Sequence, residues 1–171
     1  MITTNNQQYL SKKIITLSAL SEKIELFRIQ RKKIGLCTGS FDLLHPGHII
    51  HLQSAKKQCN ILIIAIATDE FNTRTRNTPG RPIFSQEIRA FAASQLKTVD
   101  FVTISEDTTE VIRTVKPDIY IKGQDYKNGH DPILKEQERL LNSLGGILIF
   151  TEDEKLSTTS IIDYIQKLPP I

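Results

Sequence analysis

Apolar residues alternate along the chain between short continuous runs and longer segments in which they recur at helical spacing. Continuous runs of this length predict buried parallel strands, which are covered on both faces. They occupy residues 34–38, 61–68, 100–104, 118–122 and 147–150. Segments with helical spacing separate and flank these runs, at residues 18–28, 46–58, 85–96, 109–116, 132–144 and 157–168. The polar stretch DEFNTRTRNTPGRP, residues 69–82, has no apolar period and is predicted to be a loop.

Strands and helices that alternate with short connections predict an α/β fold, because parallel strands need crossover segments. We expect a Rossmann-like, doubly wound sheet of five mostly parallel strands with helices on both faces, in a single domain over residues 1–171. About thirty residues at the start would form an N-terminal helical extension. Ligands of such sheets bind at the carboxyl ends of the strands, where the strand order reverses, so chemistry-bearing residues are expected there.

The composition fits a small cytoplasmic domain that binds an anion. The chain has 171 residues, of which 39% are hydrophobic, and a formal charge of +3. That charge suits a nucleotide but falls short of the concentrated basic face expected of a nucleic-acid-binding protein. No apolar run approaches the roughly 20 residues that cross a bilayer, and the first residues match no signal or transit pattern, so we expect no membrane contact. Cys37 and Cys59 form no CxxC motif and are expected to be reduced core residues.

The stretch GSFDLLHPGHIIHL, residues 39–52, places two histidines at the start of a predicted helix. Pro46 suits the first helical turn, where its missing N–H group costs nothing, and Gly47 allows another group to approach the backbone. His45 and His48, three residues apart, would share one face beside the free N–H groups of the helix N-terminus. The helix dipole favours an anion at that point, so the stretch predicts a cradle for a phosphate chain.

Two other interpretations of these histidines stay open. Both could be structural side chains in the core or at the surface. Together with His51 they form an H-x-x-H-x-x-H series that could bind a metal, although no cysteine or carboxylate stands at ligand spacing. We therefore expect no protein-bound metal, and we expect His51 to be structural. The G-x-G-x-x-G and P-loop motifs are absent, which excludes the common dinucleotide and P-loop fingerprints.

Other strand ends supply further candidates for binding the nucleotide. Lys122 ends a predicted strand, with Gly123 allowing a tight turn and Asp125 close behind. Three hydroxyls at the start of the last helix could hold phosphate oxygens. They belong to Ser157, Thr158 and Thr159. A solvated surface lysine and an ordinary helix cap are the alternative interpretations.

The segments after the first and second predicted strands carry the candidates for binding the second substrate. Asp42 and Asp69 stand at junctions between strands and loops. Arg74, Arg76 and Arg81 form a basic segment at the carboxyl end of a strand, where a mobile loop could close over an anionic substrate. A solvated loop is the alternative interpretation of these arginines.

No side chain stands out as a general base, and one reaction class needs none. A phosphate monoester is already ionised near neutral pH, so it can attack the α-phosphate of a nucleoside triphosphate without losing a proton. Catalysis then consists of aligning the two phosphates and neutralising the charge on the phosphorus oxygens, with Mg²⁺ bound to the triphosphate. Imidazoles, a lysine, hydroxyls and helix N-termini are the groups that this task requires.

The segment GSFDLLHPGH resembles the H-x-G-H signature of the nucleotidyltransferase superfamily, and KGQDY and LSTTSII resemble its later active-site segments. Within that superfamily the chain is most similar to the adenylyltransferase domain of ADP-heptose synthases, which activates D-glycero-β-D-manno-heptose 1-phosphate. The likeness runs from KIITLSAL through GRPIFSQEIRA and VKPDIYIKGQDY to STTSII. It implies transfer of a nucleotide, with ATP favoured as the donor, to a sugar phosphate with release of pyrophosphate. It also implies a homodimer.

The resemblance also implies roles for individual residues. His45 and His48 would bind the triphosphate and stabilise the transition state, and Lys122 would meet a phosphate as a third catalytic residue. Arg81 and Arg89 match recurrent arginines of the family, the former near the sugar phosphate. The other nucleotide-facing residues that it implies are Gly39, Ser40, Phe41, Ser157, Thr158 and Thr159.

Two other functions stay open. The segment ATDEFN, residues 67–72, looks like glycerol-3-phosphate cytidylyltransferases, which makes transfer from CTP to an alcohol phosphate the second candidate. A non-catalytic nucleotide-binding module is the third candidate. The presence of both His45 and His48 argues against it.

Overall fold

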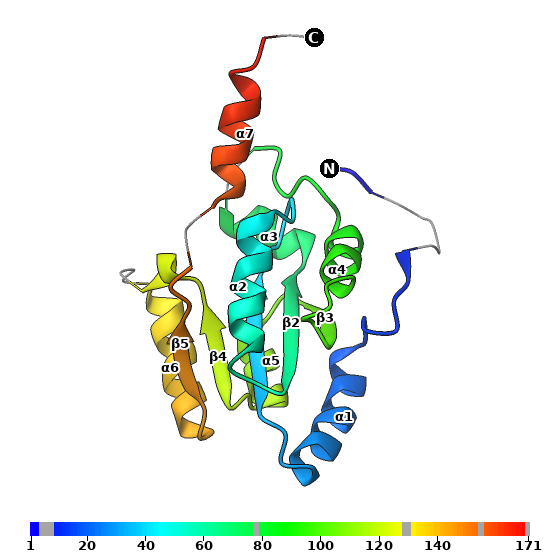
Figure 1. Cartoon of the computed structure of the whole chain (residues 1–171), viewed down its shortest axis with the longest axis vertical. Coiled ribbons are helices and arrows are strands. Elements are labelled where there is room, and N and C mark those ends of the chain that lie inside the picture. The colour runs from blue at the N-terminus through cyan, green and yellow to red at the C-terminus, as the bar shows by residue number, and fades with distance from the viewer. Residues whose placement is uncertain (4–8, 77–78, 128–130, 154–155, 170–171) are drawn as a thin grey trace.

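A central parallel sheet organises the protein (Figure 1). The computed structural model describes residues 1–3, 9–76, 79–127, 131–153 and 156–169. Among these residues, five strands form the sheet: β1 (Ile34–Gly39), β2 (Ile61–Ala67), β3 (Phe101–Ser105), β4 (Ile119–Lys122) and β5 (Ile147–Phe150). Every neighbouring pair runs parallel, which confirms the predicted Rossmann-like α/β fold with a doubly wound sheet.

The strand order β3-β2-β1-β4-β5 places a switch point next to the central strand. The chain builds outward from β1 through β2 to β3, and then crosses back to put β4 on the other side of β1. Because the connections leave β1 and β4 in opposite directions, a crevice opens at the carboxyl ends of these two strands. Thr38 and Gly39 end β1 and Lys122 ends β4, so all three residues border this crevice.

Helices cover both faces of the sheet (Figure 1). One face carries α1 (Leu17–Ile29), α5 (Thr108–Val115) and α6 (Pro132–Ser143). The other face carries α2 (Pro46–Lys56) and α4 (Gln86–Ser94). The predicted N-terminal helical extension contributes α1 to the core of the protein, because Leu20 and Ile24 are fully buried against the sheet.

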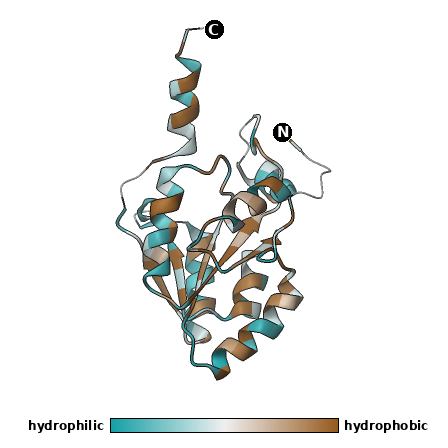
Figure 2. Cartoon of the chain, turned by 45° about the vertical axis from the view of Figure 1, so that its right-hand side comes forward, coloured by the Kyte–Doolittle hydropathy of each residue, from teal (hydrophilic) through white to brown (hydrophobic). Residues whose placement is uncertain are grey.

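Side chains that alternate along each strand supply two separate cores. Leu36 and Ile63 pack with α1, α5 and α6, whereas Cys37 and Ile64 pack with α2 and α4. Both faces of these strands are therefore covered, which is why their sequences are continuously apolar. Figure 2 shows hydrophobic residues along the strands and hydrophilic ones on the outer sides of the helices. Cys37 is a buried core residue with a free thiol, as predicted, and the thiol of the half-buried Cys59 is also free.

The predicted loop over residues 69–82 is wrong in its first half, which forms helix α3 (Asp69–Arg76). Thr68 caps this helix, since its Oγ1 accepts the N–H of Phe71 at 3.2 Å. The acidic Asp69 and Glu70 lie in the first turn, where negative side chains interact favourably with the helix dipole. The helix shows no apolar period because its buried position is occupied by a polar residue, Asn72.

The last helix, α7 (Thr158–Gln166), lies beyond the carboxyl edge of the sheet rather than against one of its faces (Figure 1). Its first turn is tied to the loop after β1, because the Oγ1 of Thr158 donates to the backbone oxygen of Asp42 at 3.0 Å. In the part of the chain that the structure describes, no helix combines the length and the apolar character needed to cross a membrane.

Candidate active site

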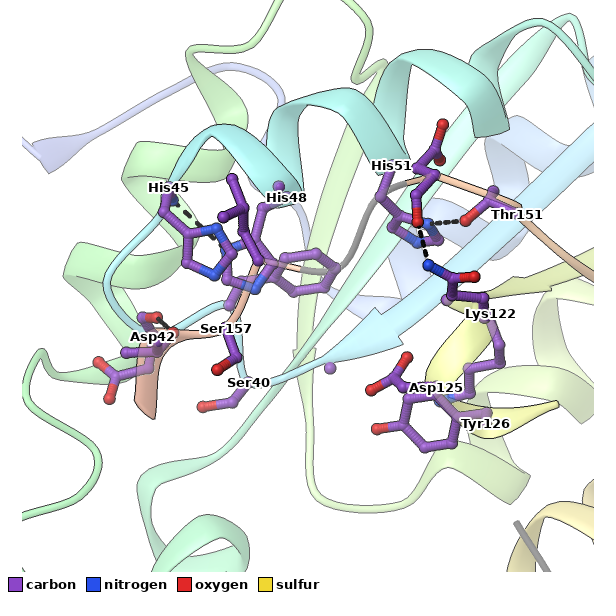
Figure 3. A pocket seen from close by; sticks show the side chains of 18 of the residues that line it. Ser40, Asp42, His45, His48, His51, Lys122, Asp125, Tyr126, Thr151 and Ser157 are labelled. Atoms are coloured by element: carbon purple, nitrogen blue, oxygen red, sulfur yellow. Dashed lines mark hydrogen bonds between the residues drawn. The ribbon is translucent and has the colours of Figure 1, made fainter. Parts of the chain in front are cut away.

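A cavity of about 240 Å³ occupies the crevice at the carboxyl ends of β1 and β4 (Figure 3). The loop after β1 and the first turn of α2 supply one wall, with His45 and His48. The end of β4 and the segment after it supply the opposite wall, with Lys122, Asp125 and Tyr126. The sheet topology therefore brings two sets of polar residues, far apart in the sequence, to either side of one cavity.

The loop between β1 and α2 has an unusual backbone conformation, which hydrogen bonds of Asp42 stabilise. Phe41 and Leu43 adopt left-handed conformations, with φ of 48° and 53°. Such conformations are unfavourable for residues other than glycine and persist where surrounding contacts impose them. Asp42 between them supplies these contacts, because its carboxylate accepts the Nε of Arg81 at 2.8 Å and the backbone N–H groups of Ile83 and Phe84 at 2.9 and 3.1 Å.

The two imidazoles stack on each other at the entrance of α2. The ring centroids of His45 and His48 are 3.9 Å apart, with 29° between the planes, and the backbone N–H of His45 donates to Nδ1 of His48 at 3.4 Å. His45 is buried, and its Nδ1 has no hydrogen-bond partner among the residues that the structure describes. Burial lowers the pKa of this imidazole, so the ring is neutral at pH 7. A buried nitrogen without a partner points to a bound ligand at this wall.

Gly47 is required by the close approach of two segments. A Cβ atom at this position would lie 2.8 Å from the Cβ of Leu156 and 3.0 Å from the Cε1 of His45. The first turn of α2 therefore packs directly against the segment that leads into α7. This contact brings the N-termini of two helices to the same cavity, where both dipoles favour negative charge.

Lys122 reaches from the end of β4 toward β1. Its ammonium donates to Oγ1 of Thr38 at 2.9 Å and lies 4.8 Å from the centre of the Tyr126 ring. The residue is only 9% exposed, and desolvation lowers its pKa, although nearby acidic groups oppose that shift. Among the described residues no carboxylate forms an ion pair with this cation, so an anion in the cavity would stabilise it.

The hydroxyls before and within the first turn of α7 have separate roles. Ser157 is the N-cap, since its Oγ accepts the N–H of Ser160 at 3.1 Å. Thr158 is buried and bonds to the loop after β1. Thr159 is exposed and lines the cavity. The hydroxyls at this helix entrance therefore do both: Ser157 caps the helix, and Thr159 lines the cavity.

Most of the predicted site residues line this one cavity. The set comprises Gly39, Ser40, Phe41, Asp42, His45, His48, Arg81, Lys122, Asp125, Ser157, Thr158 and Thr159. The predicted residues with described side chains that do not line it are Asp69, Arg74 and Arg89.

Arg89 and Asp69, both predicted to bind substrate, interact with each other instead. The fully buried Arg89 donates to Oδ1 of Asp69 at 2.6 Å. Its guanidinium also donates to the backbone oxygens of Ser40, Ala67 and Phe84. The other carboxylate oxygen of Asp69 accepts a backbone N–H at the start of α4. This network joins the ends of β1 and β2 to α4 and supports the floor of the site.

The predicted basic segment is divided by the end of α3. The exposed Arg74 lies with its guanidinium 5.9 Å from the centre of the Phe71 ring on the same helix. Arg76 is the last residue of α3, and its side chain lies outside the described part of the structure. Arg81, which holds Asp42, is the arginine of this segment that the structure places in the cavity wall.

Several lining residues were not among the predicted site residues. They are Thr38, Gly47, His51, Gly123, Gln124, Tyr126, Thr151, Asp153 and Leu156. Thr38, Gln124 and Thr151 stand at or just after the carboxyl ends of predicted strands, and that position is the signal that could have identified them. His51 bonds through Nδ1 to Oγ1 of Thr151 at 2.9 Å, which fits the structural role expected of it.

The donor set of the cavity fits a cation that enters with a phosphate ligand. Within the described residues, no group of three histidine, cysteine or carboxylate side chains could hold a metal ion. Asp125 lines the cavity opposite the imidazoles, so a carboxylate oxygen is available there. Mg²⁺ ordinarily keeps several waters and binds through substrate phosphates and one or two carboxylates, which matches this arrangement.

Comparisons with known proteins agree with this geometry. Residues 36–163 match the model of the cytidylyltransferase-like family. The "Bifunctional protein HldE" of Paramagnetospirillum magneticum is 39% identical over 82% of this chain and 28% of its own length. The protein of the same name from Desulfatibacillum aliphaticivorans is 38% identical over 90% of this chain and 31% of its own length. The chain thus spans less than a third of the length of these relatives.

Solved structures share the fold. The crystal structure of the lipopolysaccharide core biosynthesis protein from Thermoplasma volcanium has a TM-score of 0.59 and 30% identity, over 74% of this chain and 99% of that one. The pantoate-beta-alanine ligase of Francisella tularensis also has a TM-score of 0.59, but at 16% identity the likeness shows only a common fold, over 91% of this chain and 77% of that one. The family model covers the strands and the helix entrances that form the cavity. The chain belongs to the cytidylyltransferase-like family.

Proposed function

We propose that the protein transfers a nucleoside monophosphate from a nucleoside triphosphate, with ATP favoured, to a sugar phosphate. The acceptor favoured by the resemblance is a heptose 1-phosphate. An oxygen of the acceptor phosphate attacks the α-phosphorus, a new P–O bond forms, and the bond between the α-phosphate and the bridging oxygen breaks to release pyrophosphate. The observation that carries the proposal is the pair of stacked imidazoles facing Lys122 across a cavity at the switch point of the sheet.

The residues of the cavity match the charge that develops in this reaction. A phosphate monoester has a second pKa of about 6, so the attacking oxygen is ionised at pH 7 and needs no general base. His45 and His48, with the N–H groups at the start of α2, can donate to the oxygens of the β- and γ-phosphates. Lys122 faces them and can neutralise charge on the α-phosphate and the incoming phosphate. Ser157 and Thr159 offer hydroxyls from the entrance of α7.

Mg²⁺ belongs to the proposal as a partner of the triphosphate. When bound, it neutralises phosphate charge and helps to align the leaving pyrophosphate. Asp125 is a carboxylate of the cavity wall that could hold it. The imidazoles, Lys122 and the helix entrances then bind and orient the phosphate oxygens that remain.

The decisive experiment measures pyrophosphate release with each of ATP, CTP, GTP and UTP in the presence of Mg²⁺. Each nucleotide is combined with D-glycero-β-D-manno-heptose 1-phosphate or with glycerol 3-phosphate. We expect release with ATP and the heptose 1-phosphate to exceed all other combinations. Release with CTP and glycerol 3-phosphate alone would replace the proposed pair of substrates. Binding of ATP without release from any pair would indicate a nucleotide-binding module instead.

A homodimer in the cytoplasm, where nucleoside triphosphates are available, completes the proposal. Large apolar side chains are exposed on α7, including Tyr164 and Ile165, at 68% and 55%. A surface of this kind is typical of a contact with another protein, and a second copy of the chain would cover it. Sedimentation equilibrium tests this point, and a monomer at micromolar concentration would contradict it.

A further inference from the structure

A second cavity, of about 150 Å³, lies beside the first on the opposite face of the sheet. It extends between the end of β2 and the helices α5 and α6, and Val111 and Leu134 of the core on that face contribute to its lining. The two cavities meet at the ends of β1 and β4. The residues that line both are Thr38, Gly39, Ser40, Lys122 and Tyr126. A molecule bound in the second cavity can therefore reach the reacting phosphates at this junction.

A directed chain of hydrogen bonds runs from this junction under the second cavity. The ammonium of Lys122 can only donate, and it donates to Oγ1 of Thr38 at 2.9 Å. Oγ1 of Thr38 lies 2.7 Å from the hydroxyl of Tyr120, which donates to Oε1 of Gln137 at 3.2 Å. Since the single hydrogen of the Tyr120 hydroxyl goes to Gln137, the hydroxyl of Thr38 is the donor to Tyr120. Each group in the chain thus accepts from the preceding one and donates to the next.

This series of hydrogen bonds fixes the orientation of the Gln137 side-chain amide. This residue is only 8% exposed and lines the second cavity. Burial raises the pKa of the Tyr120 hydroxyl, so the hydroxyl remains protonated and keeps donating to Oε1. The amide oxygen of Gln137 is thereby occupied. Its Nε2 is the end of the amide that can donate to a molecule in the cavity.

Asn72 presents the complementary atom. Its Nδ2 donates to the backbone oxygens of Ala67 and Thr68, at 3.2 and 2.9 Å, so both amide hydrogens are occupied. Asn72 is 2% exposed and also lines the second cavity, with Oδ1 left as its acceptor. A hydroxyl group both donates and accepts, and a buried donor and a buried acceptor of fixed orientation are suited to recognising hydroxyls.

The remaining polar lining fits an uncharged, hydroxylated molecule. Ser105 and Thr108 add hydroxyls, and Glu106 and Asp131 add carboxylates that can accept from hydroxyl groups. Among the lining residues that the structure describes, Lys122 at the junction is the cation. A phosphate is therefore favoured at the junction and disfavoured beside Glu106 and Asp131, where the fixed charges are negative.

We propose that the second cavity holds the hydroxyl-bearing body of the acceptor, with Gln137 and Asn72 as the residues that recognise its hydroxyls. The proposal rests on the nucleotidyl transfer proposed above and adds where the acceptor binds and what selects it. The acceptor phosphate lies at Lys122, between the two cavities, and the nucleotide occupies the first cavity. Tyr120 is a positioning residue, because it acts on the acceptor through Gln137.

The test replaces Gln137 by methionine, which has a similar length and no hydrogen-bond donor. Isothermal titration measures the Kd of D-glycero-β-D-manno-heptose 1-phosphate, and separately the Kd of an ATP analogue whose α–β bridge is carbon. We expect Gln137→Met to raise the first Kd by about tenfold, since a buried hydrogen bond to the acceptor is lost. The Kd of the ATP analogue should change less than about twofold, within the scatter of surface substitutions.

Gln53→Met is the matched control, because Gln53 is exposed on α2 and lines neither cavity. It should leave both dissociation constants unchanged. Equal losses of heptose phosphate and nucleotide binding in Gln137→Met would overturn the proposal, since the residue would then act on the whole fold. Unchanged heptose phosphate binding in that variant would also overturn it, as would a wild-type chain that binds neither heptose 1-phosphate nor glycerol 3-phosphate.

Tyr120→Phe tests the hydrogen-bond chain. It removes the group that orients the Gln137 amide and leaves the lining of the cavity in place. We expect the KM for the acceptor to rise severalfold while kcat at saturating acceptor stays within about twofold of the wild-type value. A fall in kcat with an unchanged KM would contradict the positioning role.

The two proposals fail in different ways. Calorimetric binding needs no turnover, so it remains measurable if the wild-type chain releases no pyrophosphate with any pair of substrates. That result would contradict the proposed transfer reaction and would not affect the proposal that the second cavity binds the heptose phosphate. Normal pyrophosphate release from Gln137→Met, with an unchanged preference among acceptors, would contradict the proposed acceptor cavity. The proposed transfer reaction would be unaffected.

Discussion

The buried nitrogen of His45 and the buried ammonium of Lys122 face the same cavity, and both lack a protein group that satisfies them fully. Nδ1 of His45 has no partner among the described residues, and the partners of Lys122 are neutral oxygens of Thr38. Burying such groups costs free energy unless a ligand compensates for it. Phosphate oxygens would compensate both, so these two residues support the proposed function directly.

Replacing His48 by alanine tests the role of the imidazole pair. We expect kcat to fall by about 10²–10³, the loss typical of removing one preorganised donor to a developing oxyanion. The ring is at the helix entrance rather than in the hydrophobic core, so the melting temperature should change little. Steady-state pyrophosphate release measures the effect, with thermal unfolding as the control. Turnover within about twofold of wild type would exclude a catalytic role for His48.

Lys122 should give the proposed reaction an alkaline limit. Desolvation lowers the pKa of its ammonium, so the positive charge is lost at a lower pH than the ordinary lysine value of about 10.4. The charged form is the active one. We therefore expect kcat/KM to be constant below the lowered pKa and to decline as the pH rises through it. The profile of kcat/KM reports on the free enzyme, so bound phosphate does not mask the shift.

Lys122→Arg is the control for this limit, because a guanidinium stays charged throughout the accessible range. The alkaline decline of kcat/KM should disappear in that variant, whatever its absolute rate.

The free energy of unfolding should depend on pH in the opposite direction to kcat/KM. The folded chain binds fewer protons at Lys122 than the unfolded chain between the two pKa values, so this residue makes the protein more stable as the pH rises through that window. A wild-type kcat/KM that stays constant up to pH 10 would contradict the predicted alkaline decline.

At the level of elements, the site is an assembly of loops and helix entrances tied together by a few buried polar groups. Asp42 ties the loop after β1 to residues 81–84, and its backbone oxygen accepts the hydroxyl of Thr158 from α7. Arg89 ties the ends of β1 and β2 to α4. These hydrogen bonds hold the segments that form the walls of the cavity.

Asp42→Ala should therefore reduce stability as well as activity. The side chain is 1% exposed and accepts one charged and two backbone donors, so its removal leaves buried donors unpaired. We expect the free energy of unfolding to fall by about 3 kcal/mol, the lower end of the range for breaking a buried ion pair. Urea denaturation measures this change. Asp163→Ala, at an exposed position of α7, is the control, and an equal effect of the two substitutions would contradict the role of Asp42.

On the scale of the whole molecule, the carboxyl ends of the parallel strands and the entrances of α2 and α7 lie at one edge of the sheet (Figure 1). A ligand that bridges these segments stabilises the folded state, because it binds no comparable arrangement in the unfolded chain. The nucleotide should therefore act as a clamp across the switch point. This effect depends on affinity alone and not on which acceptor the protein uses.

The thermal stability should rise with ATP and Mg²⁺. At a hundred times Kd the ligand adds about 2.7 kcal/mol, which corresponds to an increase in Tm of about 5 to 10 °C for a chain of this size. CTP at the same concentration should give a smaller increase if the base is selected as proposed. Differential scanning fluorimetry measures both values. Equal shifts with the two nucleotides would contradict selection of ATP.

Much of this architecture follows from the sequence. Continuous apolar runs identify the strands because both faces of a doubly wound sheet are covered. Pro46 and Gly47 identify the entrance of α2 because the first helical turn tolerates a missing N–H and a close neighbour. Helix α3 escaped prediction because the residue that it buries, Asn72, is polar and satisfied by backbone oxygens. Periodicity reports hydrophobic burial, and this helix has almost none.

The roles of the charged side chains can be predicted from the sequence only in part. His45, His48 and Lys122 follow local motifs at strand ends or helix entrances, so their place at the site can be predicted from sequence. For Arg89 and Asp69 the sequence predicts contact with the substrate, whereas the tertiary structure pairs them with each other and pairs Arg89 with backbone oxygens. A charged side chain has the same chemistry in either setting. The groups within its reach depend on strand order and on how the loops pack.

The sequence by itself determined the order of the elements, their parallel arrangement and the imidazole pair at a helix entrance, because each depends on residues close together in the chain. Only the tertiary structure decided that a second cavity joins the first at Lys122 and that Tyr120 orients Gln137. Those features depend on side chains from β1, β4 and α6 meeting on one face of the sheet. A sequence pattern does not give the distance between such segments, whereas a hydrogen bond needs its donor and acceptor within about 3.5 Å of each other.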